Sequence, residues 1–212
     1  MTENGQIEIK RIGTKTILVP IRGTSPLIVS NFSEKSKRQM LEAQMGVKNT
    51  RENRDPEAEY QQAFYRLARE DGEDGYGFPA VGFKAATVGA SRFYTGLKMT
   101  ELRQFLFFKG IFTKADPQQL VEIHGTPERR EDVVRLAGAA RTAYLRYRPM
   151  FPEWTATLEV TYVHNKLAQE SVISLIDAGG LGVGVGEWRP ERKGDFGTYQ
   201  VDTNEEIVEV NG

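Results

Sequence analysis

Cysteine is absent from the 212-residue sequence, and histidine occurs only twice, as His124 and His164. The missing thiols exclude a disulfide framework, a thiolate metal site and a cysteine nucleophile. The two histidines are too far apart in the sequence to form an HExxH zinc motif. No apolar run approaches the length that spans a membrane, and the polar N-terminus is not a signal peptide. We therefore expect a cytoplasmic protein with no metal, no other cofactor and no membrane partner.

An excess of either charge is also lacking. The 28 lysines and arginines are balanced by 29 aspartates and glutamates, which leaves a net charge of −1. This balance argues against a uniformly basic coat for nucleic acid, but a local basic patch is still possible because the field depends on where the charges lie. The length suffices for one domain with an insertion, and such a domain can bury a core without disulfides.

Alternating apolar residues predict the strands. Ile17, Val19 and Ile21 alternate within the first apolar segment, which indicates a strand. Pro20 has no N–H to donate, so this strand is expected at a sheet edge or at a bulge. Further strands are predicted at 120–124, 140–148 and 154–163, near Tyr199, and at 207–210.

Helical periodicity predicts the helices. One is expected over 33–45, and a second begins where the N-cap acceptor Asp55 precedes Pro56. The apolar spacing of this second helix continues to Ala68, and a glycine-rich stop follows over 71–77. Further helices are predicted from near Gly82, over 100–108 and over 165–178, with one helical turn at 126–127.

The order of these elements has a βαββαβ character. It predicts an α+β fold of the ferredoxin-like (RRM-like) kind, with an antiparallel sheet and helices on one face. Residues 31–76 are interpreted as a helical insertion into that fold.

A glycine-rich segment, residues 179–197, is the most informative part of the sequence. Its seven glycines include Gly182, Gly184 and Gly186, a density that weakens regular structure and requires a reason. One reason is the close approach of a phosphodiester backbone. An indole that can stack on a base and cations that can hold phosphates follow in the same segment, at Trp188, Arg189, Arg192 and Lys193.

The alternative is a glycine-rich bulge packed tightly under a helix, followed by a charged hairpin tip. Glu187, Glu191 and Asp195 nearly neutralise the cations of the segment, which favours this alternative. A dinucleotide-binding fingerprint fits poorly, because its glycines lie between a strand and the helix that follows it. Here the glycines follow a predicted helix and precede a strand.

The sequence resembles the RAMP superfamily, the RNA-binding proteins that form backbone and crRNA-processing subunits of CRISPR effector complexes. Three segments carry the resemblance in the expected order: IRGTSPLIV at 21–29, FPAVGFKAA at 78–86, and the late glycine segment. The resemblance implies one RAMP-like domain over 1–212. Two departures concern the RNA contacts: seven residues separate Gly186 from Gly194, and Ala85 replaces the usual glycine.

Four longer stretches are similar to a group of bacteriophage proteins, which predicts a phage-encoded protein acting in the host cytoplasm. They are SPLIVSNFSEKSK, RENRDPEAEY, GFPAVGFKAA and GVGEWRPERKGDFG.

Other basic residues are also candidates for nucleic-acid contacts. Lys84, near a helix start, either meets a phosphate or extends to solvent. Arg146 and Arg148 share one face of a predicted strand, which is either RNA-binding or simply solvated. The predicted helix over 33–45 carries Lys35, Lys37 and Arg38. They form either a basic thumb that reaches along a nucleic acid or an ordinary solvated helix face.

Catalysis is not predicted. Some RAMP subunits cut RNA with an aspartate after their first strand, and the corresponding region here contains Asp55, Asp71 and Asp74. Asp55 is explained by helix capping, and the other two lie in a predicted turn. His124 and His164 follow strands at turns and are interpreted as surface residues.

Two hypotheses of function follow. The first is a non-catalytic protein that holds single-stranded RNA or DNA along a sheet face and assembles head-to-tail as a homo-oligomer, giving an open filament. The second is a phage structural or interaction protein that assembles with itself or with a host protein. A metal-dependent endoribonuclease is a third possibility.

Overall fold

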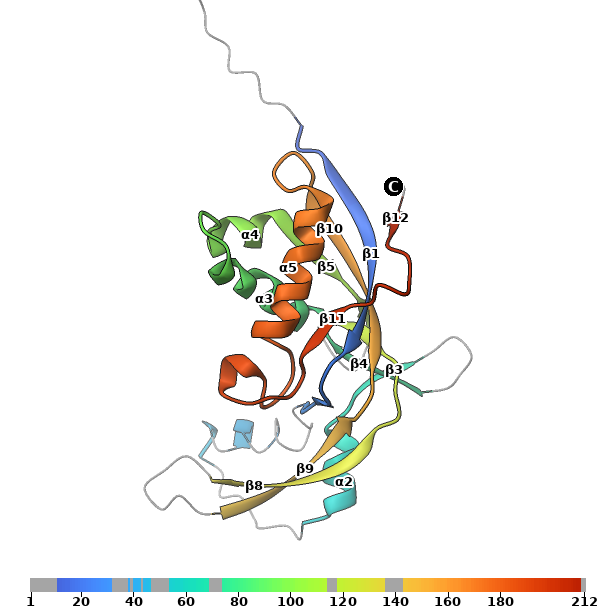
Figure 1. Cartoon of the computed structure of the whole chain (residues 1–212). Helices are drawn as coiled ribbons and strands as arrows, with labels where there is room; N and C mark the ends of the chain where they lie inside the picture. Colours follow the sequence, from blue (N-terminus) through green and yellow to red (C-terminus); the bar gives the residue numbers. More distant parts are fainter. Residues whose placement is uncertain are drawn as a thin grey trace, which may run out of the picture.

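The computed structural model describes residues 11–31, 38, 40–42, 44–46, 54–68, 74–113, 118–135 and 143–210. Within these residues the chain forms antiparallel sheets accompanied by α-helices (Figure 1). The predicted α+β class with an antiparallel sheet is therefore confirmed.

The largest sheet is built around strand β1 (Thr14–Gly23), which pairs along its length with β10 (Thr155–Val163). Strand β5 (Leu106–Lys109) extends the sheet beyond β10, while β11 (Tyr199–Val201) and β12 (Val208–Val210) pair with the other side of β1. The helices lie together on one face of this sheet (Figure 1): α3 (Ala80–Gly89), α4 (Met99–Phe105) and α5 (Gln169–Gly182), with the short 3-10 helix η1 (Ala90–Phe93) following α3.

Two smaller sheets complete the described part of the chain. One has the order β3 (Tyr65–Ala68), β4 (Asp74–Pro79), β7 (Gln119–Ile123) and β6 (Ile111–Phe112). The other has the order β2 (Leu27–Ile28), β9 (Ala143–Phe151) and β8 (Glu128–Arg135). One continuous apolar core joins all three sheets, since it includes Ile17, Phe78 and Phe151.

The prediction that Pro20 marks an edge strand is wrong. Pro20 is buried in β1 and lies opposite Thr157 of β10. On the other side of β1, its carbonyl accepts the N–H of Asp202, which lies in the gap between β11 and β12. Pro20 lies opposite Asp202, one step beyond the pair Ile21 and Val201, and it has no N–H to return this bond. The missing donor therefore coincides with the end of the β1–β11 ladder.

The second predicted helix is shorter than its apolar spacing suggested. Helix α2 (Pro56–Gln62) ends before Ala63, and the residues predicted to continue it form β3. The predicted glycine-rich stop is in part a strand as well, because β4 begins at Asp74 and pairs with β3. The described part of the predicted insertion, 31–76, therefore contains strands as well as a helix.

Two further predictions are corrected by strand pairing. The helix predicted over 100–108 ends at Phe105, because β5 pairs with β10 from Leu106 onward. The helical turn predicted at 126–127 is absent, and the charged residues after it form β8, an eight-residue partner of β9. In both places strand pairing overrides the local preference, with the distant β10 in the first case and with the next strand along the chain in the second. Strand β9 also continues to Phe151, through most of the turn predicted after residue 148.

Asp55 caps α2 as predicted. Its Oδ1 accepts the N–H of Glu57 at 3.0 Å and that of Ala58 at 3.1 Å. Replacing Asp55 by Ala should lower the free energy of unfolding by about 1 kcal/mol, because two N–H groups lose their acceptor. Urea unfolding measures this change. Asp55→Asn keeps an acceptor and is the control, and an equal loss in both variants would contradict the capping role.

Candidate nucleic-acid interface

The glycine-rich segment is divided between a helix and a loop. Helix α5 continues to Gly182, so it contains Gly179, Gly180 and Gly182. The prediction that the loop begins at residue 179 is therefore wrong for these three glycines. The loop spans residues 183–197 and contains the short 3-10 helix η2 (Pro190–Arg192).

The helical glycines allow close packing within the protein. A β-carbon on Gly179 would lie 2.7 Å from the Ala86 carbonyl oxygen of α3, and one on Gly180 would overlap the Tyr199 carbonyl of β11. A β-carbon on Gly182 would overlap the ring of Phe93. The packing alternative considered from the sequence therefore accounts for these glycines.

The loop glycines allow the chain to turn. Gly184 and Gly186 have φ angles of 69° and 77°, in the left-handed region that favours glycine. The N–H of Glu187 then donates to the Ile28 carbonyl at 2.9 Å, and the N–H of Gly197 donates to the Pro26 carbonyl at 2.8 Å. The loop is thus anchored on β2 through Glu187 and on the turn before β2 through its last residue, Gly197.

Trp188 has an unusual backbone conformation in this loop. Its φ is 56°, which a bulky L-residue rarely adopts. The N–H of Phe196 donates to its carbonyl at 3.1 Å, and the side chain remains 43% exposed. Strained residues of this kind persist only where the surrounding structure holds them in place, and they are concentrated at functional sites.

The three cations predicted near Trp188 differ in their contacts. The Arg189 guanidinium pairs with Glu191 at 2.9 Å and donates to the Gly186 carbonyl at 3.0 Å, so it stabilises the loop itself. Arg192 and Lys193 are exposed, and neither has an ion pair with any residue that the structure describes. These two side chains are the ones available for phosphates.

The predicted pair of strand arginines lies on the β8–β9 hairpin. Arg146 pairs in register with Asp132, and Arg148 with Arg130, so all four residues share one face. Arg146 is exposed, whereas Arg148 is only 4% exposed. The Arg130 Nε donates to Asp132 Oδ1 at 2.8 Å, and Arg148 Nη1 lies 3.5 Å from Asp132 Oδ2.

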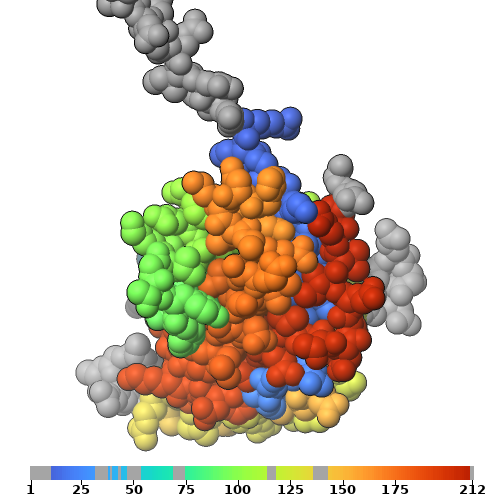
Figure 2. Space-filling model, turned by 45° about the horizontal axis from the view of Figure 1, so that its top comes forward, coloured from blue at the N-terminus to red at the C-terminus, as the bar shows by residue number. Residues whose placement is uncertain are grey.

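The loop and this hairpin face are neighbours. The Cζ of Arg130 lies 4.8 Å from the ring centroid of Phe196, and β9 pairs with β2, on which the loop is anchored. Burial lowers the pKa of Arg148, and the Glu187 carboxylate of the loop opposes that shift. In the space-filling view the C-terminal segment, in red, borders the yellow hairpin (Figure 2). We call residues 183–197 and the face carrying Arg130, Asp132, Arg146 and Arg148 the loop–hairpin surface.

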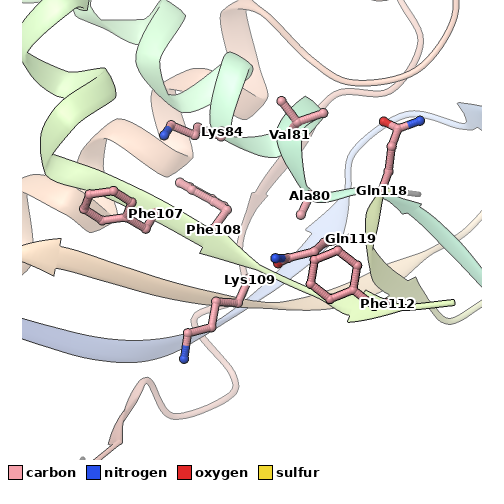
Figure 3. Close-up of a pocket in the computed structure, with 9 residues that line it drawn as sticks. All are labelled: Ala80, Val81, Lys84, Phe107, Phe108, Lys109, Phe112, Gln118 and Gln119. Atoms are coloured by element: carbon pink, nitrogen blue, oxygen red, sulfur yellow. The ribbon is translucent and has the colours of Figure 1, made fainter. Parts of the chain in front are cut away.

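Lys84 is not part of this surface. It lies on α3 in a pocket lined by residues of α3, β5, β6 and β7 (Figure 3). Burial lowers the pKa of Lys84. The Nζ of Lys84 lies 5.3 Å from the ring centroid of Phe107, which also lines this pocket.

Other predicted candidates have different positions. Lys35, Lys37 and Asp71 lie outside the described residues. Arg38 is exposed and lies 3.6 Å from Glu42 in an i,i+4 ion pair. His124 forms an isolated bridge with Thr155, and both His124 and His164 are exposed, as expected of surface residues.

Among the described residues, no group of three or more His, Asp or Glu side chains could hold a metal ion. The described helices include none that is long and apolar enough to cross a membrane.

The sequence interpretation missed Arg130 and the aromatic residues Phe107 and Phe112. Arg130 was assigned to no strand, and Phe107 was assigned to a helix. The run FLFFKGIF at 105–112 carries a signal that could have revealed the aromatics, since so many large apolar residues rarely fit into one buried face.

No family model matches the chain, and no curated protein matches it. Among solved structures, Cmr6 from Pyrococcus furiosus is 9% identical, with a TM-score of 0.44 over 91% of this chain and 100% of that one. A type III-B Cmr-beta structure bound to cognate target RNA is 10% identical, with a TM-score of 0.41 over 93% of this chain and 61% of that one. At such identities and TM-scores the likeness is confined to the general fold and does not extend to any residue of the site.

Proposed function

We propose that the protein holds single-stranded nucleic acid on the loop–hairpin surface and does not cut it. The observation that carries this proposal is Trp188, which is exposed at a left-handed φ of 56°. Its loop also carries two cations, Arg192 and Lys193, that have no ion pair among the described residues. An indole stacks on any base, and cations attract phosphates whatever the base. This combination suits a single strand held without sequence preference.

The charges of the neighbouring hairpin support the same location. Arg146 is exposed on the face that borders the loop and has no ion pair among the described residues. The large sheet is a poorer candidate, because Lys109 on its edge strand is paired with Glu159 at 2.7 Å and Thr16 is hydrogen-bonded to Thr161 at 2.8 Å. The sheet face that we propose to bind single-stranded nucleic acid is therefore that of β8–β9.

Changing Arg192 and Lys193 together to Ala should weaken binding and reduce its salt dependence. Each phosphate contact to a single strand contributes about 0.7 to the slope of log K against log salt, so the slope should fall by about 1.4. The measurement is fluorescence anisotropy of a labelled single strand, as RNA and as DNA, over a series of salt concentrations. Arg189 is left unchanged because it stabilises the loop.

The matched control is Arg92→Ala with Arg103→Ala, which removes the same charge from exposed positions on η1 and α4. This control should retain the parent slope, because Arg92 and Arg103 lie outside the proposed site. An equal fall of the slope in both variants would indicate general electrostatic attraction and not a site. Equal slopes in the parent and in the Arg192/Lys193 variant would reject the site. Unchanged thermal unfolding in both variants confirms that the fold is intact.

Assembly on the strand, giving a filament, and a phage origin both remain predictions. Solution mass with a single strand of about 50 nucleotides, several times the site size of one strand-binding fold, tests assembly. A ladder of species on the strand supports a filament. A mass that is oligomeric at high salt and unchanged by either nucleic acid would favour the interaction-protein hypothesis instead.

A further inference from the structure

A pocket of about 460 Å³ lies away from the loop–hairpin surface, between the start of α3 and the strands β5, β6 and β7 (Figure 3). Val81 and Lys84 line it from α3, Phe107 from β5, Phe112 from β6 and Gln119 from β7. This volume is within the range of pockets that hold small organic ligands.

Two aromatic rings at the pocket are exposed. Phe107 is 45% exposed and Phe112 is 69% exposed. Single exposed apolar residues are ordinary, but two phenyl rings lining one cavity form a hydrophobic patch of the kind that binds a ligand. Flat rings of this kind are stacking surfaces for a planar ligand.

A cation lies beside these rings. The Nζ of Lys84 lies 5.3 Å from the ring centroid of Phe107, and among the described residues no carboxylate pairs with it. Burial already lowers the pKa of Lys84, so an anion in the pocket would compensate for solvation that the ammonium has lost. Lys109 also lines the pocket, but its ammonium is bound to Glu159 at 2.7 Å.

A fixed amide completes the pocket. The Oε1 of Gln119 accepts the N–H of Gly110 at 2.9 Å, which orients the side chain. Its amino group has no hydrogen-bond partner among the described residues and can donate to a ligand. The pocket therefore combines stacking surfaces, one positive charge and one oriented donor.

We propose that this pocket binds one nucleotide, with the base against Phe107 and Phe112 and the phosphate on Lys84. A planar base uses the rings, its carbonyl or ring nitrogen accepts from Gln119, and the phosphate supplies the anion that Lys84 lacks. An aliphatic ligand would leave the lysine and the amide without partners. The nucleotide is either a free mononucleotide or one unit of the strand proposed above, and only the second source depends on the proposed function.

The test uses the full-length, isotope-labelled protein and three probes: AMP, adenosine and ribose 5-phosphate. AMP should shift the amide NMR signals of α3, β5 and β6 and bind more tightly than either fragment. Phe112→Ala should weaken AMP and adenosine by about 5- to 150-fold, the range found when an aromatic stacking partner of a base is removed. Lys84→Met should weaken AMP and ribose 5-phosphate and leave adenosine unchanged.

Ile111→Ala is the matched control, because Ile111 is an exposed neighbour on β6 that does not line the pocket. This variant should bind AMP like the parent. The proposal is overturned if AMP shifts none of the pocket signals, or if Phe112→Ala binds AMP as tightly as Ile111→Ala does. Pocket signals that respond to protein concentration and not to AMP would overturn it in favour of an interface between copies.

A photo-crosslinking strand that contains 4-thiouridine distinguishes the two sources. Crosslinks to the peptide containing Phe107 and Phe112 assign the pocket to the strand, whereas AMP binding without such crosslinks assigns it to a free mononucleotide. Either result supports the pocket. If AMP does not bind while the single strand still binds through Arg192 and Lys193, the pocket proposal alone is overturned. If AMP binds while the single strand does not, only the proposed function is overturned.

Discussion

Replacing Gly180 by Ala should lower the free energy of unfolding by about 3 kcal/mol, the upper part of the usual range for overpacking a core. The added methyl group would overlap the Tyr199 carbonyl oxygen and approach the Tyr199 Cδ2 of β11. A backbone carbonyl cannot rotate away as a side chain can, so α5 and β11 have to separate. Gly180 and Tyr199 are both buried, and the gap would open inside the core.

Gly182→Ala is the matched control, two residues further along the same helix. Its methyl group would meet only the end of the Phe93 ring, and Phe93 is exposed and can move. Gly182 is the last residue of α5 and does not have a left-handed φ, so alanine adds no backbone strain there and this variant should be nearly as stable as the parent. Chemical unfolding of both variants measures the difference, and equal losses would contradict the packing explanation.

The same control tests Gly182 as a nucleic-acid contact. If a phosphodiester backbone approaches Gly182 closely, the alanine variant should lose affinity for a single strand. The packing explanation expects unchanged affinity, because Phe93 already occupies the space beside Gly182. Anisotropy titration of the stable Gly182→Ala variant therefore separates the two interpretations of the glycine-rich segment.

Much of the fold could be predicted from local patterns. The alternation of Ile17, Val19 and Ile21 identified β1, and the apolar run after Pro79 identified α3. Residues 65–68 were harder, because the spacing of Tyr65 and Leu67 is compatible with an extended helix and with an alternating strand. Pairing of β3 with β4 decides between them, and a pairing partner is not visible in a local pattern.

The candidate site was predictable in its residue types and less so in its geometry. The sequence identified Trp188, Arg192 and Lys193, but it could not show that Arg189 is committed to Glu191 and the Gly186 carbonyl. It also treated every glycine of the segment alike. The glycines within α5 are explained by their contacts with α3, η1 and β11, none of which is adjacent to them in the sequence. Only folding brings those neighbours together.

The arginines of the hairpin show the same limit. Sequence alternation correctly placed Arg146 and Arg148 on one face, yet one is exposed and the other is 4% exposed. The buried guanidinium of Arg148 cannot reach a bound nucleic acid unless the loop 183–197 moves. Arg146 is therefore the better candidate for a phosphate contact, and Arg148 belongs to the interior of the loop–hairpin surface.

Asp132→Ala should destabilise the protein by about 3–5 kcal/mol, because it leaves the buried Arg148 without its nearest counter-charge. Arg148→Met should cost less, since Asp132 keeps the hydrogen bond from Arg130 Nε at 2.8 Å. The pair is imperfect in the parent protein: Arg148 Nε, Arg148 Nη1 and Asp132 Oδ2 are buried without a hydrogen-bond partner. Replacing such a pair by apolar residues of similar volume is often neutral or stabilising.

The double variant Asp132→Leu with Arg148→Met should therefore be more stable than Asp132→Ala and close to the parent. Urea unfolding of the three variants gives the order, and a double variant as unstable as Asp132→Ala would show that the charges themselves hold the hairpin against the loop. Strand affinity should change less in Arg148→Met than in the Arg192/Lys193 variant, because Arg148 is covered and the other two cations are exposed. A larger loss in Arg148→Met would mean that the loop opens and that the strand enters between the loop and the hairpin.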